Sequence, residues 1–86
     1  MFNYQFTRRA VKEIKSLPKE IQKQVFADIE EVCRSKYPLR SPNVLKLHGA
    51  YDADTFRLRS GSYRIIFRII NSSLVIDGVR HRQKGY

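Results

Sequence analysis

Cysteine is nearly absent from this chain of 86 residues, where it occurs once, as Cys33. One cysteine excludes an internal disulfide, and one cysteine with two distant histidines does not supply the ligands of a zinc site. Long apolar runs are missing too, both at the N-terminus and at any length that would span a membrane. These absences predict a reduced, cytoplasmic protein with no membrane partner, no metal and no other cofactor.

Acidic residues are scarce, with 8 Asp and Glu against 17 Lys and Arg, so the formal net charge is +9. This balance favours a polyanionic partner: a nucleic acid, an anionic membrane surface or an acidic protein. In residues 55–86 the only acid is Asp77, whereas the cations, mostly arginines, are Arg57, Arg59, Arg64, Arg68, Arg80, Arg82 and Lys84. Because arginine binds phosphate through paired hydrogen bonds, this cluster predicts nucleic-acid binding.

The first third of the chain predicts a short strand followed by two helices. Aromatic residues alternate with polar ones over residues 2–6, which is typical of a strand with one apolar face. Thr7 can cap a helix from residue 8 to about residue 16. Pro18 ends that helix and suits the first turn of a second, from residue 19 to about residue 35. So short a connection makes the two helices a hairpin.

After an irregular segment, three runs predict strands at residues 55–59, 63–70 and 74 to about 80. The turns between them, Ser-Gly-Ser and Asn-Ser-Ser, are short, so neighbouring strands should be antiparallel. The order is then β-α-α-β-β-β. It predicts an α+β fold, one domain over residues 1–86, in which the helical hairpin packs on one face of an antiparallel sheet.

Alternation along the strands places several arginines on the sheet face away from the helices. They are Arg57, Arg59, Arg64 and Arg68. Gly78 is a candidate for a β-bulge, so alternation alone does not place Arg80. The alternative is an ordinary solvated sheet face, but such a face usually mixes charges of both signs, and no acid is expected among these arginines.

Two motifs resemble the RelE/ParE superfamily of bacterial and archaeal toxins, within it the RelE branch. They are Arg57-Leu58-Arg59-Ser60-Gly61-Ser62-Tyr63-Arg64-Ile65-Ile66-Phe67 and, a dozen residues later, Val79-Arg80-His81-Arg82-Gln83-Lys84-Gly85-Tyr86. The likeness covers nearly the whole chain. It implies the toxin of a type II toxin–antitoxin pair, which cleaves mRNA, and a RelE-like microbial RNase fold. The implied partners are a cognate antitoxin, mRNA and the ribosome.

The resemblance also implies roles for individual residues. Arg64 matches the arginine that holds the scissile phosphate, and Arg80 the arginine that steadies the transition state. His81 falls where many relatives carry histidine and is a candidate acid or base. Tyr86 matches a tyrosine that stacks on a base or orients the attacking hydroxyl. The predicted RNA-binding residues are Arg57, Arg59, Arg68, Arg82 and Lys84.

The chain departs from the family pattern at two positions. Thr55 stands where some relatives have a further lysine, and Gly85 replaces the usual apolar residue before the tyrosine. Three other functions remain open, and one of them is a degenerate toxin that acts only as an antitoxin-bound repressor. ParE-type members poison DNA gyrase and do not cut RNA, and a non-catalytic RNA-binding module would bind RNA and leave it whole. The basic C-terminal cluster favours the endoribonuclease.

Overall fold

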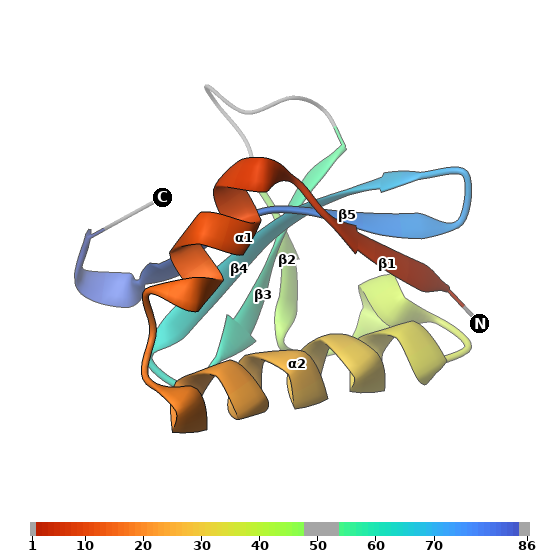
Figure 1. The fold of residues 1–86 in the computed structure, drawn as a ribbon. Helices are drawn as coiled ribbons and strands as arrows, with labels where there is room; N and C mark the ends of the chain where they lie inside the picture. Colours follow the sequence, from red (N-terminus) through yellow and green to blue (C-terminus); the bar gives the residue numbers. More distant parts are fainter. Residues whose placement is uncertain (1, 48–53, 85–86) are drawn as a thin grey trace.

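The computed structural model of this chain describes residues 2–47 and 54–84, which form a five-stranded sheet with two α-helices against one face (Figure 1). The sheet order is β1-β5-β4-β3-β2. The elements are β1 Asn3–Phe6, α1 Arg8–Lys15, α2 Lys19–Arg34, the 3₁₀ turn η1 Pro38–Arg40, β2 Val44–Lys46, β3 Thr55–Ser60, β4 Tyr63–Ile70, β5 Ser73–His81 and the 3₁₀ turn η2 Arg82–Lys84. Of the helices described, none is long and apolar enough to cross a membrane.

The N-terminal elements begin and end close to where the sequence predicts. Thr7 caps α1, because its Oγ1 accepts a hydrogen bond from the Ala10 N–H at 3.2 Å. Ser16 then closes α1 through a backbone bond to Lys12, and Pro18 immediately precedes α2. The short connection returns the chain, so both helices pack their apolar stripes against the same face of the sheet.

The core lies between the two helices and the sheet. Its members are Ala10, Ile14, Val25, Ile29, Val32, Cys33, Leu58, Ile65, Phe67, Leu74, Ile76 and Val79. Phe67 is the largest fully buried side chain. Burial raises the pKa of the Cys33 thiol, and the nearby carboxylate of Glu30 adds to the rise. This cysteine is therefore a small core residue, as its place on the apolar helix stripe predicts.

The α+β class is confirmed, and two details of the sheet differ from the sequence prediction. A short strand, β2, pairs with β3, and β1 pairs in parallel with β5, from Asn3 opposite Ser73 to Phe6 opposite Ile76. The three residues of β2 are too few to show alternation. A parallel pair needs a long crossover connection, and here the rest of the chain supplies it, so no local pattern reveals which strand β1 joins.

A β-bulge interrupts the pairing of β4 with β5, where the glycine of β5 predicted one. Phe67 lies opposite Ile76, but the residue before it on β4, Ile66, lies opposite Gly78 and not opposite Asp77. Asp77 is therefore the extra residue on β5, without a direct partner on β4. Because side chains alternate from one face to the other, one extra residue reverses the facing of everything after it.

The tip of the β3–β4 hairpin is held against α2 by polar side chains. Gln24 on α2 donates to the backbone oxygen of Ser60 at 2.9 Å, and the Ser60 hydroxyl donates to Asp28. Gly61 follows with a φ of +58°, and a Cβ placed there would lie 2.5 Å from Nε2 of Gln24. Glycine is required at this turn both by its backbone conformation and by the closeness of α2.

Replacing Gly61 with alanine is expected to lower the free energy of unfolding by about 1–2 kcal/mol, because alanine is strained at this φ and its Cβ displaces Gln24. Urea unfolding followed by circular dichroism measures the change. Ser72→Gly is the matched control: Ser72 has a φ of 64°, so glycine there should leave stability unchanged or raise it. Wild-type stability in Gly61→Ala would contradict this view of the turn.

Candidate nucleic-acid interface

Three arginines form a row across neighbouring strands on the outer face of the sheet, the face turned away from α1 and α2. Arg59 on β3 lies directly opposite Arg64 on β4, and Arg64 lies directly opposite Arg80 on β5. Directly opposite residues point to the same face, and adjacent strands lie about 4.8 Å apart. We call Arg59, Arg64 and Arg80 the arginine row.

The bulge is what brings Arg80 into this row. An uninterrupted ladder from Phe67 and Ile76 would place Arg80 opposite Tyr63, on the face that the helices cover. With the extra residue, Val79 takes the buried position and is 4% exposed, and Arg80 turns to the outer face. Arg80, which alternation alone could not place, therefore lies on the same face as Arg59 and Arg64.

Two arginines of the row, Arg59 and Arg64, are oriented by local acceptors. Arg59 donates through Nη2 to Oδ1 of Asn43 at 3.0 Å. Arg64 donates through Nη1 to the backbone oxygens of Gly61 and Tyr63, both at 2.9 Å. These acceptors are neutral, so they hold the guanidinium groups in place and leave their charges uncompensated.

The row therefore carries an electrostatic cost in the free protein. Like charges directly opposite each other on antiparallel strands destabilise a sheet by roughly 0.2–1 kcal/mol per pair. Among the residues that the structure describes, the one carboxylate ion-paired to this row is Glu13, which approaches Arg80 at 3.7 Å. Three guanidinium groups with so little compensation form a surface suited to a polyanion.

The other two arginines of the outer face have different surroundings. Arg57 lies opposite Ile66, and its Nε is buried with no hydrogen-bond partner among the described residues. Arg68 makes a two-pronged ion pair with Asp77, at 2.6 and 3.0 Å. An acid therefore lies among the charges of this face, contrary to the sequence prediction. Asp77 is the bulged residue, so this pair also fastens the bulge to β4.

His81 lies on the other side of β5 from the arginine row. It is opposite Tyr63, and the two rings meet edge to face with centroids 5.2 Å apart. Its Nδ1 accepts a hydrogen bond from the Gln83 N–H at 3.2 Å, which leaves Nε2 as the nitrogen that can exchange a proton with a ligand. Arg80 and His81 nevertheless line one hollow of about 290 Å³ between α1 and the end of β5.

The remaining predicted site residues lie beyond β5. Arg82 is exposed, and its backbone N–H donates to the Ser62 oxygen at 2.8 Å, which ties η2 to the β3–β4 turn. Tyr86 and the side chain of Lys84 lie outside the described residues. Their predicted roles stay predictions.

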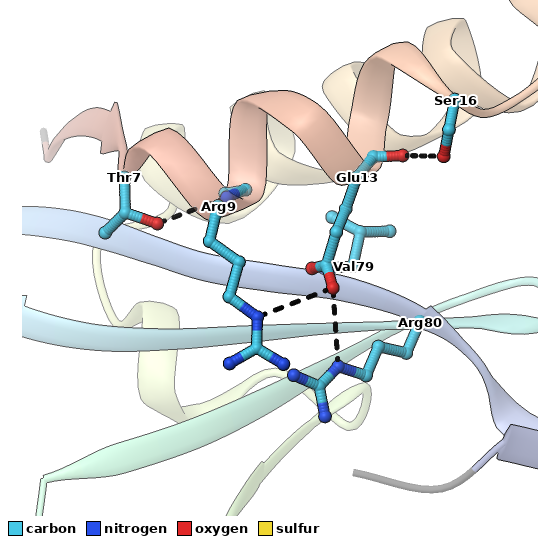
Figure 2. A network of polar contacts seen from close by, with 7 residues as sticks. Thr7, Arg9, Glu13, Ser16, Val79 and Arg80 are labelled. Carbon is cyan, nitrogen blue, oxygen red and sulfur yellow. Dashed lines mark hydrogen bonds and ion pairs between the residues drawn. The ribbon is translucent and has the colours of Figure 1, made fainter.

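The sequence prediction did not include Glu13, the acid of α1 that reaches the site. Figure 2 shows its carboxylate between Arg9 of its own helix and Arg80 of β5. Its Oε1 also accepts the backbone N–H of Val79 at 3.0 Å. No local signal marks this residue, because a glutamate on the polar face of a helix is ordinary and its partners on β5 lie more than 60 positions away.

Comparisons with known proteins extend over nearly the whole chain. Residues 4–86 match a family model described as the ParE toxin of the type II toxin–antitoxin system parDE. The chain is 31% identical to the mRNA interferase toxin RelE of Escherichia coli (strain K12), over 94% of this chain and 85% of that protein.

Solved structures of toxin–antitoxin complexes share the fold. The toxin–antitoxin complex RelBE2 from Mycobacterium tuberculosis matches with a TM-score of 0.72 and 28% identity, over 94% of this chain and 98% of that chain. The archaeal RelE–RelB complex from Pyrococcus horikoshii OT3 matches with a TM-score of 0.74 and 25% identity, over 98% of each chain.

The pair between Arg68 and Asp77 gives a testable prediction about the bulge. Asp77→Asn is expected to lower the free energy of unfolding by about 1 kcal/mol, because both groups are about one-third exposed and the pair is two-pronged. Chemical denaturation measures it. Asp54→Asn is the matched control, since Asp54 is exposed and its substitution should change stability little. Equal effects of the two substitutions on stability would argue that the ion pair between Arg68 and Asp77 does not stabilise the bulge.

Proposed function

Because this chain belongs to the RelE/ParE superfamily, as a RelE-like toxin of the type II toxin–antitoxin class, we propose that it is an endoribonuclease. Its proposed substrate is mRNA in the ribosomal A site, and cleavage there would inhibit translation. The observation that carries this proposal is the arginine row, which gathers three guanidinium groups on one rigid surface. Its relative in Escherichia coli is named an mRNA interferase, which supports the same substrate class.

RNA carries its own nucleophile, so the proposed reaction requires no metal in principle. The 2′-hydroxyl oxygen attacks the adjacent phosphorus while the bond from phosphorus to the 5′-oxygen breaks. The products are a 2′,3′-cyclic phosphate and a 5′-hydroxyl. One proton leaves the 2′-oxygen and one reaches the 5′-oxygen. Negative charge grows on the two non-bridging oxygens, and this is where the protein has most to contribute.

In this proposal Arg64 and Arg80 bind the non-bridging oxygens. They lie directly opposite each other on adjacent strands, and both are oriented before RNA arrives. Donors that are already in place stabilise a transition state without reorganising at the moment of reaction. His81, through Nε2, and Tyr86 are the proposed groups for proton transfer, and Tyr86 is also suited to stacking on a base.

The remaining basic residues are proposed to bind the RNA backbone. They are Arg57, Arg59, Arg68, Arg82 and Lys84. Of the five, Arg59 belongs to the arginine row and has a neutral acceptor. Arg68 is paired with Asp77, so RNA would compete with that carboxylate for its charge. We also propose a cytoplasmic location and, as in the RelE–RelB complexes, a cognate antitoxin as partner.

The difference between Arg59 and Arg68 predicts different salt dependences of RNA binding. Arg59→Ala should flatten the plot of log affinity against log salt by about 0.7, the value for one lost phosphate contact on a single strand. Arg68→Ala should change the slope less, because Asp77 already neutralises Arg68. Titrations with a 2′-O-methyl RNA, which cannot be cleaved, measure both slopes. A larger change for Arg68→Ala would contradict the predicted difference.

Cleavage itself is tested on ribosomes programmed with mRNA. Arg64→Ala and Arg80→Ala should each lower the single-turnover cleavage rate by roughly a hundredfold or more, because each removes a preorganised donor. Primer extension locates and quantifies the cuts. Arg34→Ala is the matched control, since Arg34 is exposed on α2 and its loss changes the net charge equally. An equal loss of rate in Arg34→Ala would mean that the arginine row acts only through general charge attraction.

The family model that matches is described as a ParE toxin, so inhibition of DNA gyrase is a second candidate function. The two candidates differ in a supercoiling reaction. An endoribonuclease leaves gyrase-driven supercoiling intact and cuts mRNA in a translating extract. Blocked supercoiling with intact mRNA would overturn the endoribonuclease proposal in favour of the ParE-type activity. Intact mRNA with unaffected supercoiling and salt-dependent RNA binding would favour a binding module.

A further inference from the structure

We propose that Glu13 on α1 is a positioning residue, which orients Arg80 so that the outer edge of its guanidinium group faces the RNA phosphate. The inference rests on the proposed function of Arg80. Glu13 does not lie among the residues that the family resemblance identifies, and the structure assigns it through its contacts with β5.

Both carboxylate oxygens of Glu13 have partners. Oε1 accepts the Val79 N–H at 3.0 Å, while Oε2 lies 3.6 Å from Nε of Arg9 and 3.7 Å from Nε of Arg80. In Figure 2 the two arginines approach this carboxylate from the helix and from the strand. The hydrogen bond to the backbone fixes one oxygen, and the rigid carboxylate group then fixes where the other oxygen meets Arg80.

The fold explains why a helix side chain can reach the backbone of β5 at this point. β1 pairs with β5 only as far as Phe6 and Ile76, and the Thr7 N–H makes the last backbone bond, to the Ile76 oxygen. The chain then turns into α1, which runs beside β5 and leaves that edge of the strand without a neighbouring strand. Glu13 satisfies the Val79 N–H that β1 no longer covers.

Gly78 leaves the space for this carboxylate. A Cβ at Gly78 would lie 2.7 Å from Oε1 of Glu13, which is closer than two such atoms can approach. The same glycine belongs to the bulge that turns Arg80 to the outer face. One short segment of β5 therefore both aims Arg80 and admits the group that holds it.

The chemistry of the contact favours positioning over simple neutralisation. Glu13 meets Arg80 at Nε, and the two terminal nitrogens of Arg80 have no hydrogen bond or ion pair within residues 2–47 and 54–84. Those nitrogens form one of the paired edges with which arginine binds phosphate. The negative charge of Glu13 also offsets repulsion between Arg80 and Arg64, its direct neighbour in the row.

The isosteric substitution Glu13→Gln tests this role. Its side-chain oxygen can still accept the Val79 N–H, but the charge that holds Arg80 is gone. We expect the single-turnover cleavage rate on programmed ribosomes to fall about tenfold, since small misplacements of a reacting group have effects of this order or larger. The toxin concentration that gives the half-maximal single-turnover rate should change less than about twofold, because removing the charge at position 13 removes no contact with RNA.

Glu20→Gln is the matched control, an identical change of charge at an exposed position in the first turn of α2. It should leave the rate unchanged. The Glu13→Gln protein should also keep the melting temperature of the wild type within a few degrees, so that a lower rate cannot be attributed to unfolding. A rate within twofold of wild type in Glu13→Gln would overturn the inference.

A double-substitution cycle shows whether Glu13 acts through Arg80. In an Arg80→Ala background, Glu13→Gln should have no further effect on cleavage, because the group that it positions is missing. If Glu13→Gln lowers the rate tenfold in that background as well, Glu13 acts by another route and the inference is wrong.

A measurement that does not depend on cleavage separates this inference from the proposed function. In ¹⁵N NMR spectra, the Nε–H signal of Arg80 should shift in Glu13→Gln relative to the wild type, because Nε loses the carboxylate charge that lies 3.7 Å away. An unchanged signal would overturn the inference. If the Arg80 Nε–H signal shifts in Glu13→Gln, yet the wild type cuts no RNA, the contact stands and the endoribonuclease proposal fails.

Discussion

One extra residue in β5 decides which side chains of that strand join the arginines of β3 and β4 on the outer face. Asp77 has no direct partner on β4, and everything after it in β5 is turned to the opposite side of the sheet. Without this bulge, the charged side chain of Arg80 would face the core and Val79 would face solvent. The ion pair between Asp77 and Arg68 fastens the extra residue to the neighbouring strand. The acid in this basic region therefore stabilises the bulge.

The arginine row is possible because the opposite face of the same strands is strongly stabilised. Leu58, Ile65 and Phe67 are almost completely buried beneath the helices. Burying an apolar side chain of this size contributes roughly 1.5–3 kcal/mol, whereas a pair of opposed like charges costs roughly 0.2–1 kcal/mol. The stability of the core therefore outweighs the repulsion of two opposed arginine pairs on the outer face. A bound anion would lower that repulsion.

The helices also hold the ends of the strands that carry the row. Gln24 and Asp28 of α2 fix the hairpin tip next to Arg59 and Arg64, and Glu13 of α1 reaches the free edge of β5 next to Arg80. The row is thus supported by side chains from both helices, although the helices lie on the other side of the sheet. Rigid support of this kind is what electrostatic stabilisation of a transition state requires.

Local patterns in the sequence predicted much of this molecule. The cap at Thr7 and the break at Pro18 set the helices, because capping and proline act on their immediate neighbours. Alternation placed Arg59 and Arg64 on one face, because the period of a strand is two. The two motifs predicted the family, and the excess of arginine predicted a polyanionic ligand.

Only the tertiary structure decided how these parts meet. The glycine in β5 marked a possible bulge, but the facing of Arg80 depends on its pairing with β4, and the partner of β1 is a strand some 70 positions away. Glu13 shows the same limit, because its partners Val79 and Arg80 are distant in the chain and adjacent only in space. Local geometry is encoded by neighbouring residues, whereas register and long-range ion pairs depend on the packing of the complete sheet.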